Sequence, residues 1–140
     1  MANTKQSSTT SSNLPQILLV EDNPVALRFV ESIVSQAGCH FVSAMDGEQA
    51  LALAKSTIFD LIITDIELPG ISGIELTHLI REWEKSLKKS PIPIIGLTAH
   101  TLCESEENCL QAGMNKVLNK PLYLHQMREL LSQYIRIIEN

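Results

Sequence analysis

Five side chains that could take part in chemistry follow short apolar runs in this sequence. They are Glu21, Asp22, Asp65, Thr98 and Lys120. Runs of this length that are rich in branched aliphatic residues are typical of buried strands in a parallel sheet. In open α/β sheets, ligands bind just outside the carboxyl ends of the strands. Although the five residues lie far apart in the sequence, we therefore expect them to converge in one cleft.

The three acids among them indicate a metal site. Carboxylates that lie close together repel one another, so such a cluster requires a cation or bound protons. Glu21, Asp22 and Asp65 offer only oxygen ligands, which favours a hard ion. Mg²⁺ is the natural choice, because it binds through one or two carboxylates and keeps positions for phosphate oxygens. Lys120 adds a cation for the same phosphate, and Thr98 adds a hydroxyl donor.

Asp65 is the candidate nucleophile of this site. A carboxylate can attack phosphorus and form an aspartyl phosphate when a metal and a lysine offset the charge on the equatorial oxygens. We expect the strand before Asp65 to be central in the sheet, which makes this residue the best candidate. Glu21 and Asp22 are then metal-site acids.

Alternating strands and helices are predicted to position these residues. The strand candidates are the apolar runs 16–20, 41–44, 60–64, 93–97 and 115–119. Apolar residues at helical spacing follow each run and predict helices from Pro24 to about 37, through 50–54, through 76–87, over about 102–111 and through 124–138. Pro24 suits a first helical turn, and Gly38 and Gly113 suit helix ends.

Repeated strand–helix units of this kind favour a parallel sheet with helices on both faces. A parallel crossover must leave the sheet and return to it with right-handed sense. The 140 residues have room for one domain with a hydrophobic core, which we place at residues 14–140. Residues 1–13 are rich in Ser and Thr and nearly free of apolar groups, which predicts a disordered leader or linker.

Composition narrows the classes of partner and compartment. A net charge of -5 without a basic run argues against a general nucleic-acid or anionic-membrane surface. Cys39, Cys103 and Cys109 lack the spacing of a zinc site or a disulfide framework, and we interpret them as small apolar residues in a reducing, cytoplasmic setting. No apolar stretch approaches the length of a membrane span.

Four motifs in order carry a resemblance to a known family. The motifs are the run from Leu18 to Asn23, Asp65 followed by Leu68-Pro69-Gly70 and Gly73, the run Leu97-Thr98-Ala99, and Lys120-Pro121. With these motifs, the sequence resembles the receiver domain of two-component response regulators over roughly residues 16–138, and it is most similar to receivers of hybrid sensor histidine kinases.

The resemblance implies a fold and a set of roles. The fold would be a flavodoxin-like (βα)5 three-layer sandwich with a five-stranded parallel sheet of order 2-1-3-4-5. Asp65 would be the phosphoacceptor, and Mg²⁺ would be held by Asp22, Asp65 and the main-chain carbonyl of Glu67, with Glu21 acting largely through water. Thr98 would hydrogen-bond the phosphoryl group and Lys120 would pair with it. The Lys120-Pro121 bond would be cis.

The resemblance also implies partners. The phosphoryl group would come from a phosphohistidine on a histidine kinase or a histidine phosphotransfer domain, and the receiver would catalyse the transfer itself. The added charge would change the surface formed by the loop after Thr98, the fourth and fifth predicted helices and the fifth predicted strand. The chain would be a monomer or weak dimer, without direct nucleic-acid or membrane contact, and a fragment of a hybrid kinase.

Two positions depart from the family pattern. Val117 stands where most members carry Tyr or Phe, so no aromatic ring can change rotamer together with Thr98. Either coupling then occurs through backbone movement alone, or the receiver relays phosphate and needs little conformational output, and we favour the relay. Glu67 lies two residues past Asp65, where the family places side chains that tune dephosphorylation. Its carboxylate is interpreted either as such a group, in contact with the metal or the acyl phosphate, or as a rim charge.

Other functions were weighed against this one. Phosphatases of the haloacid dehalogenase type also use a strand-end Asp with a second acid two residues on, as in Asp65-Ile66-Glu67, but they leave the Glu21-Asp22 pair unexplained. A receiver-like domain that binds without phosphorylation would not need all five site residues. Ordinary roles are expected for the remaining candidates: core packing for Trp83, and surface roles for His40, His78 and His125, with His100 able to line the cleft.

Overall fold

A five-stranded parallel sheet forms the centre of the protein in this computed structural model, which describes residues 14–99 and 103–135. The strands are β1 (Gln16–Val20), β2 (His40–Ala44), β3 (Leu61–Asp65), β4 (Ile94–Thr98) and β5 (Lys116–Asn119). Their order across the sheet is β2-β1-β3-β4-β5. This is the predicted order, and each strand agrees with its predicted run to within a residue at either end.

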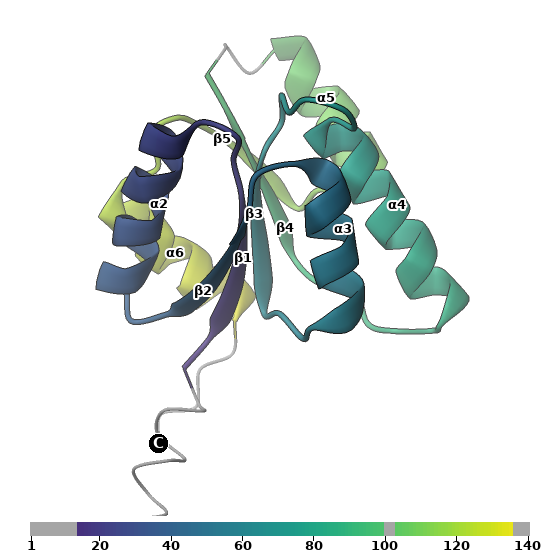
Figure 1. Ribbon diagram of the computed structural model, residues 1–140, viewed down its shortest axis with the longest axis horizontal. Helices are drawn as coiled ribbons and strands as arrows, with labels where there is room; N and C mark the ends of the chain where they lie inside the picture. Colours follow the sequence, from purple (N-terminus) through teal and green to yellow (C-terminus); the bar gives the residue numbers. More distant parts are fainter. Residues whose placement is uncertain (1–13, 100–102, 136–140) are drawn as a thin grey trace, which may run out of the picture.

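Five helices alternate with the strands and cover both faces of the sheet (Figure 1). They are α2 (Pro24–Gln36), α3 (Gly47–Ser56), α4 (Gly73–Ser86), α5 (Cys103–Ala112) and α6 (Leu124–Tyr134). Helices α2 and α6 lie on one face, and α3, α4 and α5 lie on the other. The predicted three-layer, flavodoxin-like (βα)5 sandwich is therefore confirmed. The predicted continuation of the last helix to residue 138, and Leu102 at the start of α5, lie outside the described residues.

Two apolar clusters, one on each side of the sheet, hold the layers together. Alternate residues of β1 point to opposite faces: Ile17 and Leu19 pack toward α2 and α6, and Leu18 and Val20 pack toward α3 and α4. All residues of β3 and β4 are buried, as expected for central strands of a sheet that is covered on both faces. This burial fixes the central strands, and with them the positions of the side chains at their carboxyl ends.

Side chains at the helix amino ends set where each helix leaves the sheet edge. Asn23 Oδ1 accepts hydrogen bonds from the backbone N–H groups of Val25 and Ala26 at the start of α2. Asp46 caps α3 and Ser72 caps α4 in the same way, at distances of 2.7 and 3.1 Å. Such caps satisfy donors that a helix leaves unpaired. The segments that follow β1, β2 and β3 therefore lead into helices whose first turns are fixed by side-chain caps.

Helix α4 departs from its predicted apolar face. Trp83 was expected in the core, and this prediction is wrong, because its side chain is only half-buried and Lys89 Nζ lies 5.2 Å from its ring centroid. Leu87 is 56% exposed. Thr77 and Glu84 are buried instead: the Thr77 hydroxyl donates to Gly73 O, and Glu84 accepts hydrogen bonds from Arg81 and from the backbone N–H of Ile92.

Candidate functional site

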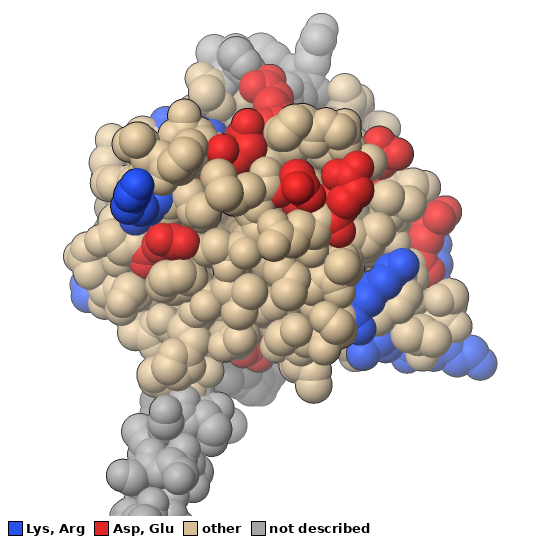
Figure 2. Space-filling model, viewed as in Figure 1, with Lys and Arg blue, Asp and Glu red and all other residues tan. Residues whose placement is uncertain are grey.

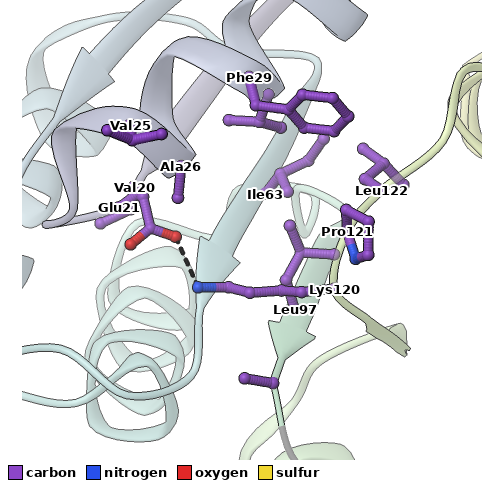
Figure 3. Close-up of a pocket in the computed structure, with 12 residues that line it drawn as sticks. Val20, Glu21, Val25, Ala26, Phe29, Ile63, Leu97, Lys120, Pro121 and Leu122 are labelled. Atoms are coloured by element: carbon purple, nitrogen blue, oxygen red, sulfur yellow. Dashed lines mark hydrogen bonds and ion pairs between the residues drawn. The ribbon is translucent and has the colours of Figure 1, made fainter.

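The ends of β1, β3 and β5 bring two carboxylates and an amine into direct contact. Lys120 Nζ lies 2.8 Å from Glu21 Oε1 and 3.2 Å from Asp65 Oδ2. Glu21 and Asp65 are 5% and 7% exposed. Figure 3 shows the Lys120 side chain extended toward Glu21. In the order of the sheet, the strand before Lys120 lies two strands from β3, which ends on Asp65, and three strands from β1, which precedes Glu21.

Three carboxylates form a compact oxygen cluster at this edge. Glu21, Asp22 and Asp65 each offer an oxygen, and these atoms all lie within 4.8 Å of one another. Asp22 is exposed, whereas the other two are buried. Oxygen donors alone, at this separation and with one open side, suit a hard cation that keeps some of its water. The cluster fits Mg²⁺ as the sequence predicted.

The loop after β3 is folded tightly around Asp65. The backbone N–H of Glu67 donates to Asp65 Oδ1 at 3.1 Å, and the N–H of Gly73 donates to Ile66 O at 2.8 Å. A Cβ at Gly73 would lie 2.3 Å from Asp65 O, so no other residue fits there without moving the backbone. This packing places the Glu67 peptide beside the carboxylate of Asp65. The Glu67 side chain itself is exposed and lies outside the carboxylate cluster.

Thr98 ends the strand next to β3 and is 1% exposed. It pairs with Asn119 across β4 and β5, and its carbonyl accepts a hydrogen bond of 2.8 Å from the backbone N–H of Lys120. The Lys120-Pro121 peptide bond is cis, as predicted. Backbone pairing thus holds Thr98 and Lys120 in register.

Burial and the neighbouring charges shift both ionisable groups at the centre of the site. The pKa of Asp65 is raised, first by burial and then by the negative charge of Glu21, while Lys120 and the Glu67 N–H lower it by less. Burial disfavours the charge on Lys120, yet its hydrogen bond to Glu21 and the charge of Asp65 outweigh this and raise its pKa. Because burial and Glu21 together oppose the charge on Asp65, a bound cation would favour its charged form.

The other candidates lie away from this cluster. His78 pairs with Glu82 at 3.3 Å and His125 stacks on Tyr123, both on helix surfaces, and His40 is exposed at the start of β2. His100 and the Cys103 side chain lie outside the described residues. Cys39 and Cys109 are free and buried, and burial raises the pKa of the Cys39 thiol to about 11. Neither is a reactive thiolate at neutral pH.

An apolar groove beside the site was missed by sequence reasoning. A cavity of about 400 Å³ borders Glu21 and Lys120 and is lined by Val25 and Phe29 of α2 and by Pro121 and other apolar groups (Figure 3). Val25 is 76% exposed and Phe29 is 44% exposed. The signal was present in the sequence: both residues are apolar but lie off the helical stripe that α2 buries.

Comparison with known proteins agrees with this geometry. Residues 17–132 match the family described as the response regulator receiver domain. The chain belongs to this receiver family. It is 33% identical over 124 residues to the sensor protein GacS of Pseudomonas syringae pv. syringae, covering 89% of this chain and 14% of that protein. It is 32% identical to the sensor histidine kinase RcsC of Escherichia coli K12, covering 84% of this chain and 12% of that protein.

Solved receiver structures share the fold. The receiver domain of a sensor histidine kinase from Pseudomonas aeruginosa PAO1, with a magnesium ion coordinated in its active site cleft, is 37% identical with a TM-score of 0.76, covering 87% of this chain and 98% of that one. The receiver domain of Saccharomyces cerevisiae Ssk1, crystallised with the histidine phosphotransfer protein Ypd1, is 28% identical with a TM-score of 0.80, covering 86% of this chain and 88% of that one. The match to the receiver family favours a receiver over a phosphatase of the haloacid dehalogenase type.

Proposed function

We propose that this receiver takes a phosphoryl group from a phosphohistidine onto Asp65 in a Mg²⁺-dependent reaction. The observation that carries the proposal is the contact of one buried carboxylate with both an amine and a carboxylate cluster: Lys120 Nζ at 3.2 Å, and oxygens of Glu21 and Asp22 within 4.8 Å. A nucleophile, a metal site and a phosphate-binding cation are the parts that phosphoryl transfer requires.

Asp22, Asp65 and the main-chain carbonyl of Glu67 would hold the ion, with Glu21 acting through water. When bound, Mg²⁺ supplies positive charge that offsets the carboxylates and binds oxygens of the transferred group. Glu21 also fixes Lys120 through the 2.8 Å contact with its amine. Its other oxygen accepts from the backbone N–H of Asn23 at 3.1 Å, which orients the carboxylate toward the site.

In the transfer step, an Asp65 carboxylate oxygen attacks phosphorus and forms the P–O bond as the P–N bond to the donor imidazole breaks. The bonding pair stays on the imidazole nitrogen. Asp65 Oδ1 already accepts from the Glu67 N–H and Oδ2 faces Lys120, so Lys120 is placed to offset charge on the transferred group. Thr98, at the end of the adjacent strand, supplies a hydroxyl to a phosphoryl oxygen.

A histidine-bearing helix of a kinase or phosphotransfer domain would dock on the apolar groove beside α2. Val25 and Phe29 present exposed apolar surface next to Glu21 and Lys120, and exposed apolar patches of this kind mark interaction sites. Docking there would leave the donor imidazole facing Asp65.

The residue at position 117 suits a relay. Val117 is 4% exposed and packs in the cluster under α3, α4 and α5, where it has no ring to rotate and no hydroxyl to move. Phosphorylation would therefore change the structure mainly at the site itself, and Asp65 would pass its phosphoryl group to another histidine.

The chain spans only 14% and 12% of the two relatives GacS and RcsC. We further infer that it serves as the receiver module of a cytoplasmic hybrid kinase, as a monomer or weak dimer.

Beryllofluoride, a phosphoryl mimic, tests this proposal by amide NMR. With Mg²⁺ present, we expect large amide shifts near Asp22, Asp65, Thr98 and Lys120, and small shifts along β5 and the described parts of α5, since Val117 lacks a moving ring. Asp65→Asn is the control and should show none of these shifts. Absence of shifts at the site in the folded wild-type protein would contradict phosphorylation there, and large shifts throughout the β5 and α5 surface would contradict the relay.

A further inference from the structure

Four lysines gather at the end of the molecule opposite the phosphorylation site. Lys55 ends α3, and Lys85, Lys88 and Lys89 lie at and just beyond the end of α4. They are four of the seven lysines in a chain of net charge -5. Figure 2 shows acidic side chains toward the upper end of this face and basic ones at its lower right, below α3 and α4. We call these four lysines with Ile58 and Trp83 the basic foot.

The charges of the basic foot are not neutralised by carboxylates of the described residues. Among the residues that the structure describes, none of the four ammonium groups forms an ion pair. The acids on the same helix are engaged elsewhere: Glu84 is 2% exposed and pairs with Arg81 at 2.8 Å, and Glu82 pairs with His78. Lys85 lies in the last turn of α4, where a cation suits the helix dipole, but Lys88 and Lys89 lie beyond the helix.

Two hollows adjoin in the basic foot and share Lys89. One, of about 430 Å³, lies between the ends of α3 and α4 and is lined by Lys55, Ile58, Trp83 and neighbouring residues. The other, of about 390 Å³, includes Arg81, Lys85 and Pro91. Ile58 is 85% exposed. Lys89 Nζ lies 5.2 Å from the Trp83 ring centroid, so an apolar ring and a cation border the same hollow.

The turn that presents the lysines adopts a backbone conformation that favours glycine. Lys88 has φ of 56°, and its neighbour Lys89 donates its backbone N–H to Glu84 O at 2.9 Å. This position after a helix is most often Gly, because a side chain in the left-handed region costs about 1–2 kcal/mol. Among the described residues, no acid pairs with Lys88 to offset that cost, which is consistent with a role at the surface.

We propose that the basic foot is a docking surface for an acidic segment of a partner polypeptide. Carboxylates of that segment contact Lys55, Lys85, Lys88 and Lys89, and one of its apolar side chains enters the hollow beside Ile58 and Trp83. An acidic segment fits this surface because its carboxylates complement the four lysines, which are gathered at one end of an otherwise acidic chain. Concave hollows on either side of a turn fit a polypeptide better than the flat surface of a bilayer. The docked segment does not cover the site around Asp65, because that site lies at the opposite end of the strands.

Trp83 reports on this surface directly, since it is the only tryptophan of the chain. The probe is a short peptide that alternates glutamate and leucine and contains no aromatic residue. We expect a saturable change in tryptophan emission that weakens as salt is added. Lys88→Glu should weaken binding on the order of tenfold. Lys88→Gly, which suits the backbone there, should weaken it by less while keeping the fold.

Arg128→Glu is the matched control, because it makes the same change in charge at an exposed site on α6, on the other face of the sheet. It should bind the peptide like the wild type. No emission change, or equal binding by wild type and Lys88→Glu, would overturn the proposal. A response to phosphatidylserine vesicles without one to the peptide would also overturn it and identify a membrane surface. Beryllofluoride binding at Asp65 should be unaffected by Lys88→Glu.

Discussion

Asp65 combines a buried position with the need to carry charge. Its carboxylate is 7% exposed and lies among Glu21, Asp22 and Lys120. Burial and Glu21 raise its pKa more than Lys120 lowers it. The free domain therefore holds a carboxylate whose ionisation opposes folding. The same arrangement favours a bound cation, because a divalent ion removes the repulsion that the single lysine leaves.

Asp65→Asn should therefore stabilise the metal-free protein at pH 7. Because the pKa of Asp65 is raised in the folded state, its contribution to stability is full below the unfolded pKa and is lost as pH rises through the folded pKa. Asn keeps the uncharged form at every pH. The free energy of unfolding of the variant should thus exceed that of the wild type at pH 7 and equal it in acid.

Urea unfolding across this pH range, in the presence of a chelator, measures the difference. Added Mg²⁺ should narrow or reverse the gap, because the ion binds the folded wild type and not the variant. Asp60→Asn is the control, since Asp60 is an exposed acid outside the cluster, at the opposite edge of the sheet. A wild type more stable than Asp65→Asn at pH 7 without Mg²⁺ would show that Lys120, and not Glu21, governs the charge of Asp65.

At the scale of elements, strands were easier to predict than helix faces. The convergence of the candidate residues could be predicted because apolar runs such as 61–64 are followed by polar residues, and parallel strands place all their carboxyl ends on one side of the sheet. Helix α4 was harder. A stripe of apolar residues predicted Trp83 in the core, but the buried position nearby is filled by Glu84. Its partners are Arg81 of the same helix and the backbone N–H of Ile92 in the loop that follows the helix. Spacing alone does not reveal such partners.

The groove along α2 was missed for a related reason. Helical periodicity identifies the residues that a helix buries, and Val30, Ile33 and Val34 are indeed buried. It gives no role to apolar residues off that stripe, and Val25 and Phe29 are such residues. Only the structure shows that they lie next to Glu21 and Lys120. Docking surfaces depend on elements that are adjacent in space, which one sequence does not specify.

Glu84 gives a test of how α4 is attached to the sheet. Its carboxylate bonds Arg81, and Arg81 also donates to Gly113 O and to Asn115 Oδ1, which joins α4 to the start of β5. Glu84→Ala would leave the half-buried guanidinium and the Ile92 N–H without this acceptor. We expect a loss of about 3 kcal/mol in the free energy of unfolding, measured by urea denaturation.

Glu82→Ala is the matched control on the same helix, because Glu82 is exposed and pairs only with exposed His78. It should change stability by less than about 0.5 kcal/mol. Equal effects of the two substitutions would show that the Arg81–Glu84 pair does not anchor α4.

At the scale of the whole molecule, the carboxyl ends of the strands carry an acidic cluster, and the opposite end of the molecule carries a basic one. The carboxyl edge gathers Glu21, Asp22 and Asp65, whereas the other edge carries the lysines of the basic foot. The layers between them are packed on both faces of the sheet. None of the described helices is long and apolar enough to cross a membrane. One partner could therefore bind at each edge without competing for the same surface.

The intact mass of the protein after incubation with a small phosphoryl donor shows directly whether Asp65 is phosphorylated. We expect a single phosphoryl adduct that requires Mg²⁺, is removed by hydroxylamine as an acyl phosphate is, and is absent from Asp65→Asn. Lys120→Ala should form the adduct far more slowly while keeping its fold. A wild-type protein that stays unmodified with Mg²⁺ and with both a small donor and a phosphohistidine protein, or an adduct that persists in Asp65→Asn, would contradict the account.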